Sequence, residues 1–182
     1  MRAFVAVPVS SKLALELLAV RDDLLADIPS SQPRAVPAAN FHLTLAFLGD
    51  IDADRVDALD ALLSTVAAEC MPFQQPLTEV AAFPTARDRI VAAQGRAVDD
   101  LSVLHRRLWQ RLSMSGFEQR DEQALRPHVT LARLRLPVVP PVRVACQLML
   151  DVTALVLFES VQRQGRAVYR PLRRAELFRA VT

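Results

Sequence analysis

Residues 40–50 of the chain read Asn-Phe-His-Leu-Thr-Leu-Ala-Phe-Leu-Gly-Asp, and residues 126–133 read Arg-Pro-His-Val-Thr-Leu-Ala-Arg. Alternating side chains of this kind favour a β-strand with one buried face. Side chains two residues apart share a face of a strand, so His42 lies beside Thr44 and His128 beside Thr130. Each strand is therefore expected to bury an apolar face and to present one imidazole next to one hydroxyl.

The two stretches resemble each other over six residues, 41–46 and 127–132, and lie 86 residues apart. Too few positions match for the sequence repeat of a solenoid protein. The match instead predicts two similar lobes within one domain that covers residues 1–182, a length typical of a single domain.

Outward from these strands, helical and strand patterns are mixed along the chain, which predicts an α+β fold. Strands are expected at 3–9, 41–48, 77–82, 89–93, 128–134, 152–160 and 168–178, the last two as a hairpin around Gln164-Gly165. Helices are expected after Ser10 or Ser11, over 53–69 with Asp52 as the cap, and over 98–114 with Gly116 as the stop. Residues 29–37 are expected to form a loop, and residues 137–141 a stiff connector.

The composition predicts a globular protein, with 52% hydrophobic residues, 23% charged residues and a mean hydropathy of +0.20. Net charge is +2, and Lys12 is the single lysine. Arginine binds phosphate through a planar fork of donors, although a GC-rich genome would equally explain its abundance. Cys70 and Cys146 are expected to be free thiols, and with no signal or membrane segment the protein is expected in the cytoplasm as a monomer.

Two imidazoles that face each other across a cleft suit the cleavage of a phosphodiester. One neutral ring can take a proton from water while one charged ring gives a proton to the leaving oxygen. The hydroxyls of Thr44 and Thr130 can donate to the phosphate oxygens, and Arg126 shares the face of His128 by strand parity. No metal or other cofactor is required, and the residues alone do not tell which histidine is the acid.

A zinc site is the sharpest competing interpretation, but it needs three or four ligands, and neither strand has a carboxylate or cysteine at ligand spacing. The third histidine, His105, is expected on a helix surface. The sequence contains no nucleophile elbow, no Walker loop and no glycine-rich dinucleotide fingerprint.

The two signatures, with flanks at 2–7, 82–84 and 165–172, closely resemble those of the 2H phosphoesterases, and in particular the bacterial and archaeal RNA 2′,3′-cyclic phosphodiesterases, also called 2′-5′ RNA ligases. The resemblance implies a bilobal α+β fold with two antiparallel sheets lining a central cleft, helices outside and pseudo-twofold symmetry. It implies metal-independent hydrolysis of a terminal 2′,3′-cyclic phosphate to a 2′-phosphate. It makes His42 the proton donor and His128 the proton acceptor, with Thr44 and Thr130 holding the phosphate.

The chain departs from this resemblance at residues 89–93, where Ala92 stands in place of an expected base-stacking aromatic. The expected partners are RNA 3′ ends or small cyclic nucleotides. Three alternatives stay open: a 2′-5′ RNA ligase that uses the same histidines, an enzyme for another small cyclic phosphate such as a cyclic ADP-ribose phosphate, and a non-catalytic protein that binds RNA ends.

Overall fold

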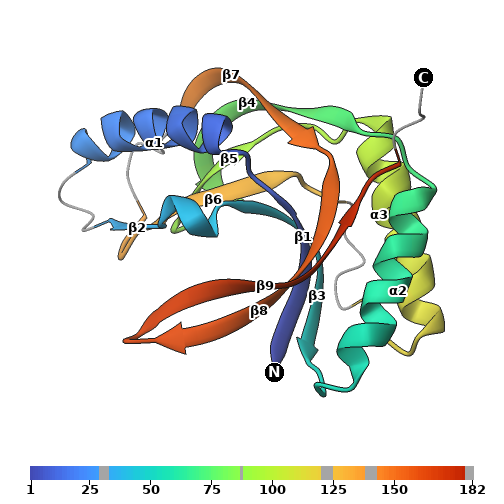
Figure 1. The fold of residues 1–182 in the computed structure, drawn as a ribbon. Helices are drawn as coiled ribbons and strands as arrows, with labels where there is room; N and C mark the ends of the chain where they lie inside the picture. The colour runs from blue at the N-terminus through green and yellow to red at the C-terminus, as the bar shows by residue number, and fades with distance from the viewer. Residues whose placement is uncertain (29–32, 87, 120–124, 138–142, 179–182) are drawn as a thin grey trace.

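The computed structural model describes residues 1–28, 33–86, 88–119, 125–137 and 143–178 (Figure 1). Its strands are β1 (Arg2–Pro8), β2 (Arg34–Ala35), β3 (His42–Asp50), β4 (Phe73–Phe83), β5 (Ile90–Gln94), β6 (His128–Arg133), β7 (Arg143–Val152), β8 (Ala154–Arg163) and β9 (Arg166–Glu176). Its helices are α1 (Ser11–Ala26), α2 (Arg55–Ala68), α3 (Asp99–Met114) and the short 3-10 helix η2 (Ala38–Asn40). The predicted α+β class is confirmed.

The strands form one antiparallel sheet in the order β7-β4-β5-β6-β3-β1-β8-β9, with β2 beside β6. The order is symmetric about the contact between β6 and β3. On one side β3 pairs with β1, and α1 lies between these two strands in the chain; on the other side β6 pairs with β5, and α3 lies between them. We call β3-β1-β8-β9 the first half and β6-β5-β4-β7 the second half. The two sheets expected from the sequence thus exist as halves joined by backbone pairing.

The joint between the halves is narrow. Leu43 pairs with Val129, and this is the one register pair between β3 and β6 in the described residues. Leu43 and Val129 are both fully buried. Because the strands are antiparallel, the residues on either side of this pair come opposite each other, His42 near Thr130 and Thr44 near His128.

Each His-x-Thr strand carries an irregularity at the same place. The register of β3 against β1 shifts between Thr44 and Ala46, and that of β6 against β5 shifts between Thr130 and Ala132. An extra residue in one strand reverses the alternation beyond it. As a result Phe47, which is 69% exposed, returns to the face of His42, and Arg133 returns to the face of His128.

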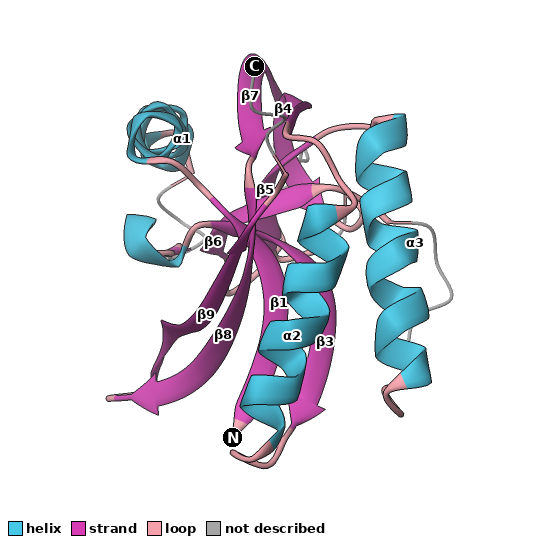
Figure 2. Cartoon of the chain, turned by 45° about the vertical axis from the view of Figure 1, so that its right-hand side comes forward, coloured by secondary structure: helices cyan, strands magenta, loops and turns pink. Residues whose placement is uncertain are grey.

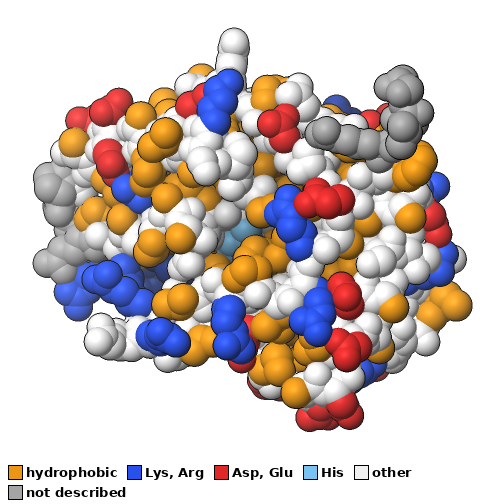
Figure 3. All heavy atoms as spheres, viewed as in Figure 1, with side chains coloured by type: hydrophobic (Ala, Val, Ile, Leu, Met, Phe, Trp, Pro, Cys, Tyr) orange, Lys and Arg blue, Asp and Glu red, His pale blue; other side chains and the backbone are white. Residues whose placement is uncertain are grey.

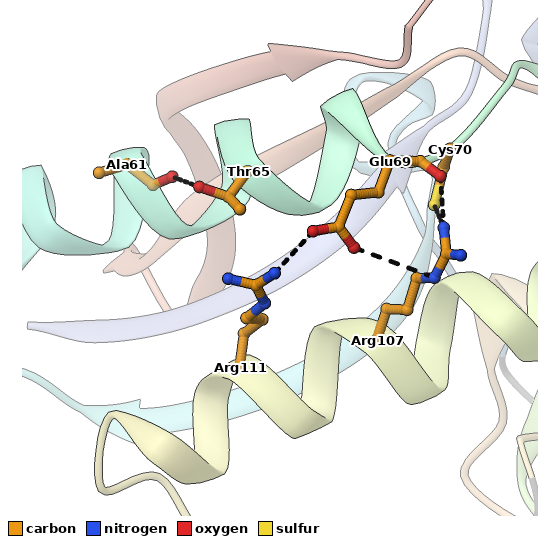
Figure 4. Close-up of polar contacts among 6 residues, drawn as sticks. All are labelled: Ala61, Thr65, Glu69, Cys70, Arg107 and Arg111. Carbon is orange, nitrogen blue, oxygen red and sulfur yellow. Dashed lines mark hydrogen bonds and ion pairs between the residues drawn. The ribbon is translucent and has the colours of Figure 1, made fainter.

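The helices lie on two sides of the sheet (Figures 1 and 2). Helix α1 packs against β6 and β7, whereas α2 and α3 lie side by side and α2 packs against β8 and β9. Figure 4 shows how α2 and α3 are linked, with the Glu69 carboxylate 2.6 Å from the Arg111 guanidinium. Arg107 donates to the carbonyl of Glu69 and to Cys70 Sγ, the latter at 3.6 Å. Cys70 and Cys146 are both free cysteines.

Most expected elements are present within a few residues. Ser10 caps α1 by accepting from the Leu13 amide, and the β8–β9 hairpin turns at Gln164 and Gly165, both with positive φ. Asp52 is not the cap of α2, because the helix begins later, after Asp54.

Strand β7 was not expected. It lies at the edge of the sheet, and its apolar residues alternate, with Leu150 and Val152 buried and Asp151 between them exposed, so the sequence does carry the period-two pattern of a strand here. Most of the connector at 137–141, and residues 29–32 of the expected loop, lie outside the described residues, while β2 lies in the rest of that loop and η2 directly follows it.

Candidate active site

His42 is fixed by the segment just before it. Its Nδ1 lies 2.6 Å from the carbonyl oxygen of Asn40, which can only accept, so Nδ1 carries the hydrogen and the neutral ring presents a bare Nε2. The Asn40 side chain in turn donates to the Ala167 carbonyl at 2.8 Å and accepts from the Tyr169 amide at 3.4 Å. Strand β9 therefore helps to hold the segment that orients the His42 ring.

Aromatic rings surround His42 in the first half. Its centroid lies 4.9 Å from that of Phe4, 5.0 Å from Tyr169 at a right angle, and 6.2 Å from Phe158. Burial among these rings lowers the pKa of His42 from 6.5 to about 4, against the hydrogen bond to Asn40, and the nearby His128 lowers it further.

His128 is held in a matching way in the second half. Its Nδ1 lies 2.9 Å from the carbonyl oxygen of Arg126, two residues earlier, so its neutral ring also presents a bare Nε2. The ring stacks on Phe83 with centroids 3.9 Å apart. Burial lowers the pKa of His128, the hydrogen bond to the Arg126 carbonyl opposes that shift, and the charge of Arg126 adds to it.

Arg126 lies beside His128, but its guanidinium is already engaged. It sits 4.9 Å from the Phe83 ring centroid and donates to the Pro84 carbonyl at 2.7 Å. The sequence predicted a phosphate contact for this side chain. In the structure it completes a stack of His128, Phe83 and Arg126, and the predicted contact stays a prediction.

Thr44 and Thr130 complete the arrangement. Both are half-buried like the two histidines, and each lies two residues after its own histidine and opposite the histidine of the other half. Residues two apart on a strand are about 7 Å apart, and directly opposite residues are about 5 Å apart. The four side chains therefore form a small rectangle, with the histidines at one pair of diagonal corners and the hydroxyls at the other.

The position at which a base-stacking aromatic ring was expected holds Ala92. Ala92 lies opposite Thr130 and is fully buried, so it offers no platform to a base. The ring of Phe83, at the end of β4 on the same lobe, is itself buried and stacks on His128. Asn40 was within the first signature stretch, and Phe83 and Tyr169 were within the flanking stretches, but spacing alone assigned them no role.

His105 lies apart from the pair of histidines, on α3, where its ring is 6.4 Å from that of Trp109. It is half-buried, whereas the sequence suggested an exposed side chain. Trp109 is in the core, as expected, and its indole donates to the Leu45 carbonyl at 3.2 Å. Gln94 and Arg126 line a cavity of about 690 Å³ that adjoins the site and reaches His105.

Two absences hold for the part of the chain that the structure describes. No group of three or more His, Cys, Asp or Glu side chains is arranged to hold a metal ion there. None of the helices there is long and apolar enough to span a membrane.

The sequence of this chain is similar to those of known proteins. The family model of the LigT like phosphoesterases matches residues 7–92. An Escherichia coli K12 protein named RNA 2′,3′-cyclic phosphodiesterase is 31% identical over 150 residues, 80% of this chain and 81% of that protein. A Geobacillus stearothermophilus protein of the same name is 28% identical over 131 residues, which are 71% of this chain but 41% of the relative.

Solved structures agree over almost the whole length. A Thermus thermophilus protein superposes with a TM-score of 0.83 at 25% identity, covering 97% of this chain and 98% of that one. Escherichia coli LigT in complex with 3′-AMP superposes with a TM-score of 0.76 at 27% identity, covering 98% of both chains.

Proposed function

Because the chain belongs to the LigT-like phosphoesterase family, we propose that it hydrolyses the 2′,3′-cyclic phosphate at an RNA 3′ end to a 2′-phosphate by histidine acid/base catalysis without metal. The observation that carries the proposal is the rectangle of two histidines and two threonines about the Leu43–Val129 pair. Each imidazole in it is locked by a carbonyl at Nδ1, so Nε2 of each ring is the atom left for chemistry.

The proposed reaction needs two proton transfers at these Nε2 atoms. His128 takes a proton from a water molecule as the water oxygen attacks phosphorus, and the bond from phosphorus to the 3′-oxygen breaks. His42 gives a proton to that oxygen, which leaves as the 3′-hydroxyl, and the phosphate stays on the 2′-oxygen. Thr44 and Thr130 would donate to the two non-bridging oxygens, with Arg126 close enough to add positive charge.

The lowered pKa of both histidines bears on their roles. At neutral pH both rings are neutral in the free protein, which suits His128 as a base. His42 can act as an acid only once it has gained a proton. The negative charge of a bound phosphate favours the protonated ring and so raises the pKa of His42. We therefore propose that substrate and proton enter the site together.

The test uses an RNA oligonucleotide with a terminal 2′,3′-cyclic phosphate in excess EDTA, with the products read by phosphorus NMR. We expect a 2′-phosphate. His42→Ala and His128→Ala should each lower kcat by about 10²- to 10⁴-fold, the usual worth of a general acid or base. His105→Ala, the remaining histidine, serves as the matched control and should keep wild-type kcat. Activity that EDTA abolishes and zinc restores would refute the mechanism.

The donor role of His42 has its own test, because a sulfur leaving group does not need a proton. A substrate with sulfur in place of the bridging 3′-oxygen releases a thiolate, whose conjugate acid has a pKa of about 8.5. We expect this substrate to rescue His42→Ala and not His128→Ala. Rescue of His128→Ala alone would exchange the two roles.

The same site could join a 2′,3′-cyclic phosphate to a 5′-hydroxyl, since the 5′-hydroxyl would attack phosphorus in place of water while the 3′-oxygen leaves as before. Water is present at about 55 M, so ligation requires a second bound and aligned RNA end. We therefore propose hydrolysis as the main activity, of a monomer acting in the cytoplasm on RNA 3′ ends or small cyclic nucleotides. Size-exclusion chromatography with light scattering tests the oligomeric state.

A further inference from the structure

The arginines of this chain differ in their partners. Several of them form ion pairs with carboxylates: Arg21, Arg107, Arg111, Arg143, Arg170, Arg173 and Arg174. Among the described residues, Arg34, Arg133, Arg163 and Arg166 have no such ion pair, and the same holds for others such as Arg2, Arg55, Arg96 and Arg106. The first four, Arg34, Arg133, Arg163 and Arg166, are all exposed, and we call them the rim arginines.

The rim arginines come from separate parts of the chain and meet at one place. Arg34 on β2 is the direct partner of Arg133 on β6, so their side chains share a face. Arg34 also donates to the carbonyl of Gly165, in the turn of the β8–β9 hairpin. Arg163 and Arg166 are directly paired and flank that turn. The fold therefore brings like charges together from three elements.

Like charges that lie side by side repel each other, and nearby carboxylates usually compensate for this. No carboxylate in the described part of the chain pairs with a rim arginine, although Glu69 neutralises the arginines between α2 and α3 (Figure 4). An uncompensated group of guanidinium ions is the electrostatic footprint of a polyanion site, and the fork of arginine fits phosphate oxygens.

The rim arginines adjoin the proposed active site. Arg133 lies three residues beyond Thr130, and the strand irregularity between them turns its side chain back to the face of His128. Figure 3 shows a histidine at the bottom of a hollow, with Lys and Arg side chains gathered below it and to the left. The turn that Arg34 contacts is also in the hairpin that carries Tyr169, which packs on His42.

We propose that the rim arginines bind the phosphodiester backbone of the single RNA strand that leads into the site, on the 5′ side of the terminal cyclic phosphate. This inference rests on the proposed function and extends it from the terminal nucleotide to the strand behind it. The protein then selects RNA ends over cyclic mononucleotides, because a mononucleotide has no phosphodiester for the rim arginines to bind.

Equilibrium binding tests this without requiring turnover. A short single-stranded RNA with a fluorescent 5′ end and a 3′-terminal 2′-phosphate is titrated with protein across a range of salt, and binding is read by anisotropy. For single strands the logarithm of the binding constant falls with the logarithm of salt by about 0.7 per phosphate engaged. Four contacts give a slope of about −2.8, and each single Arg→Gln substitution among the rim arginines should reduce its magnitude by about 0.7.

Turnover gives a second readout. The ratio of kcat/KM for the oligonucleotide to kcat/KM for a 2′,3′-cyclic mononucleotide should fall in Arg34→Gln and Arg133→Gln. It should fall also in the Arg163→Gln, Arg166→Gln double variant, whose changes lie at an exposed turn that can accept them without loss of fold. Arg111→Gln is the matched control, since it removes an arginine already neutralised by Glu69.

The outcomes separate the two proposals. Reduced salt slopes in the rim variants with a wild-type slope in Arg111→Gln support the inference. Equal slopes in wild type and rim variants overturn it, whatever the turnover. Failure of the wild-type protein to open any cyclic phosphate, with the salt slopes as expected, overturns the proposed function and leaves an RNA-end-binding surface.

Discussion

The burial of His42 leads to a sharp prediction about protonation. In the free protein its pKa is lowered to about 4, so at pH 7 about one molecule in a thousand carries the imidazolium. Placing one negative charge about 4 Å from the ring is worth about 4 kcal/mol at an effective dielectric constant of about 20. This equals about three pKa units, so binding of the phosphate should return the pKa of His42 to about 7.

The perturbation is the addition of a non-hydrolysable 2′,3′-cyclic phosphonate with one fixed negative charge. NMR titration follows the ring signals of His42, identified by their loss in His42→Ala, with and without saturating ligand. We expect the pKa to rise by about three units. By reciprocity the affinity for the ligand should weaken by up to about 1,000-fold as pH rises from about 4 to about 7, because the protonated ring binds the anion better.

His105 provides the internal control, because it lies on α3 beside Trp109 and is not one of the four side chains of the rectangle, so its pKa should respond to the ligand far less than that of His42. The reasoning is refuted by a free-protein pKa of His42 near 6.5, since the aromatic enclosure would then not desolvate the ring. It is equally refuted by a pKa near 4 that the ligand leaves unchanged, since His42 could then not serve as an acid at neutral pH.

Three further predictions concern other parts of the same site. The free energy of unfolding, measured with urea, should drop by about 3 kcal/mol between pH 7 and pH 4. The reason is that His42 takes up a proton with a pKa of 6.5 in the unfolded chain but only with a pKa of about 4 in the folded chain. An unfolding free energy that does not change with pH in the wild-type protein contradicts this. Thr44→Val and Thr130→Val should each reduce kcat/KM by about 10- to 100-fold through loss of a hydrogen bond to a charged group, while Thr65→Val, on an exposed face of α2, changes nothing. Ala92→Trp, which places an indole at the fully buried position opposite Thr130, should destabilise the fold by about 1–3 kcal/mol or more in thermal melts rather than tighten nucleotide binding.

The paired His-x-Thr strands could be predicted from the sequence because alternation over a few residues is a local property. The same holds for the Ser10 cap and the turn at Gln164 and Gly165, whose residue types satisfy local backbone geometry. Parity also placed Arg126 beside His128. What parity could not give was the direction of its guanidinium, which depends on Phe83 and Pro84 from another part of the chain.

The remaining features depend on contacts between distant segments. Strand β7 is an exception, because its buried Leu150 and Val152 alternate with exposed residues and a local pattern therefore marks it, in addition to its pairing with β4. The irregularities in β3 and β6 move Phe47 and Arg133 onto the face of the site, where simple alternation would have put them on the other side. The depressed pKa of His42 likewise arises from rings on β1, β8 and β9 that no local pattern connects.

The single backbone pair between Leu43 and Val129 has a consequence for how the site is built. Each histidine of the rectangle lies opposite the threonine of the other half, so neither half alone contains the complete arrangement. A small rotation of one half about that pair would separate His42 from His128 while leaving each strand intact. The relative position of the two histidines therefore depends on the single Leu43–Val129 pair. Packing changes at Leu43 or Val129 would alter kcat without changing any of the four side chains of the rectangle.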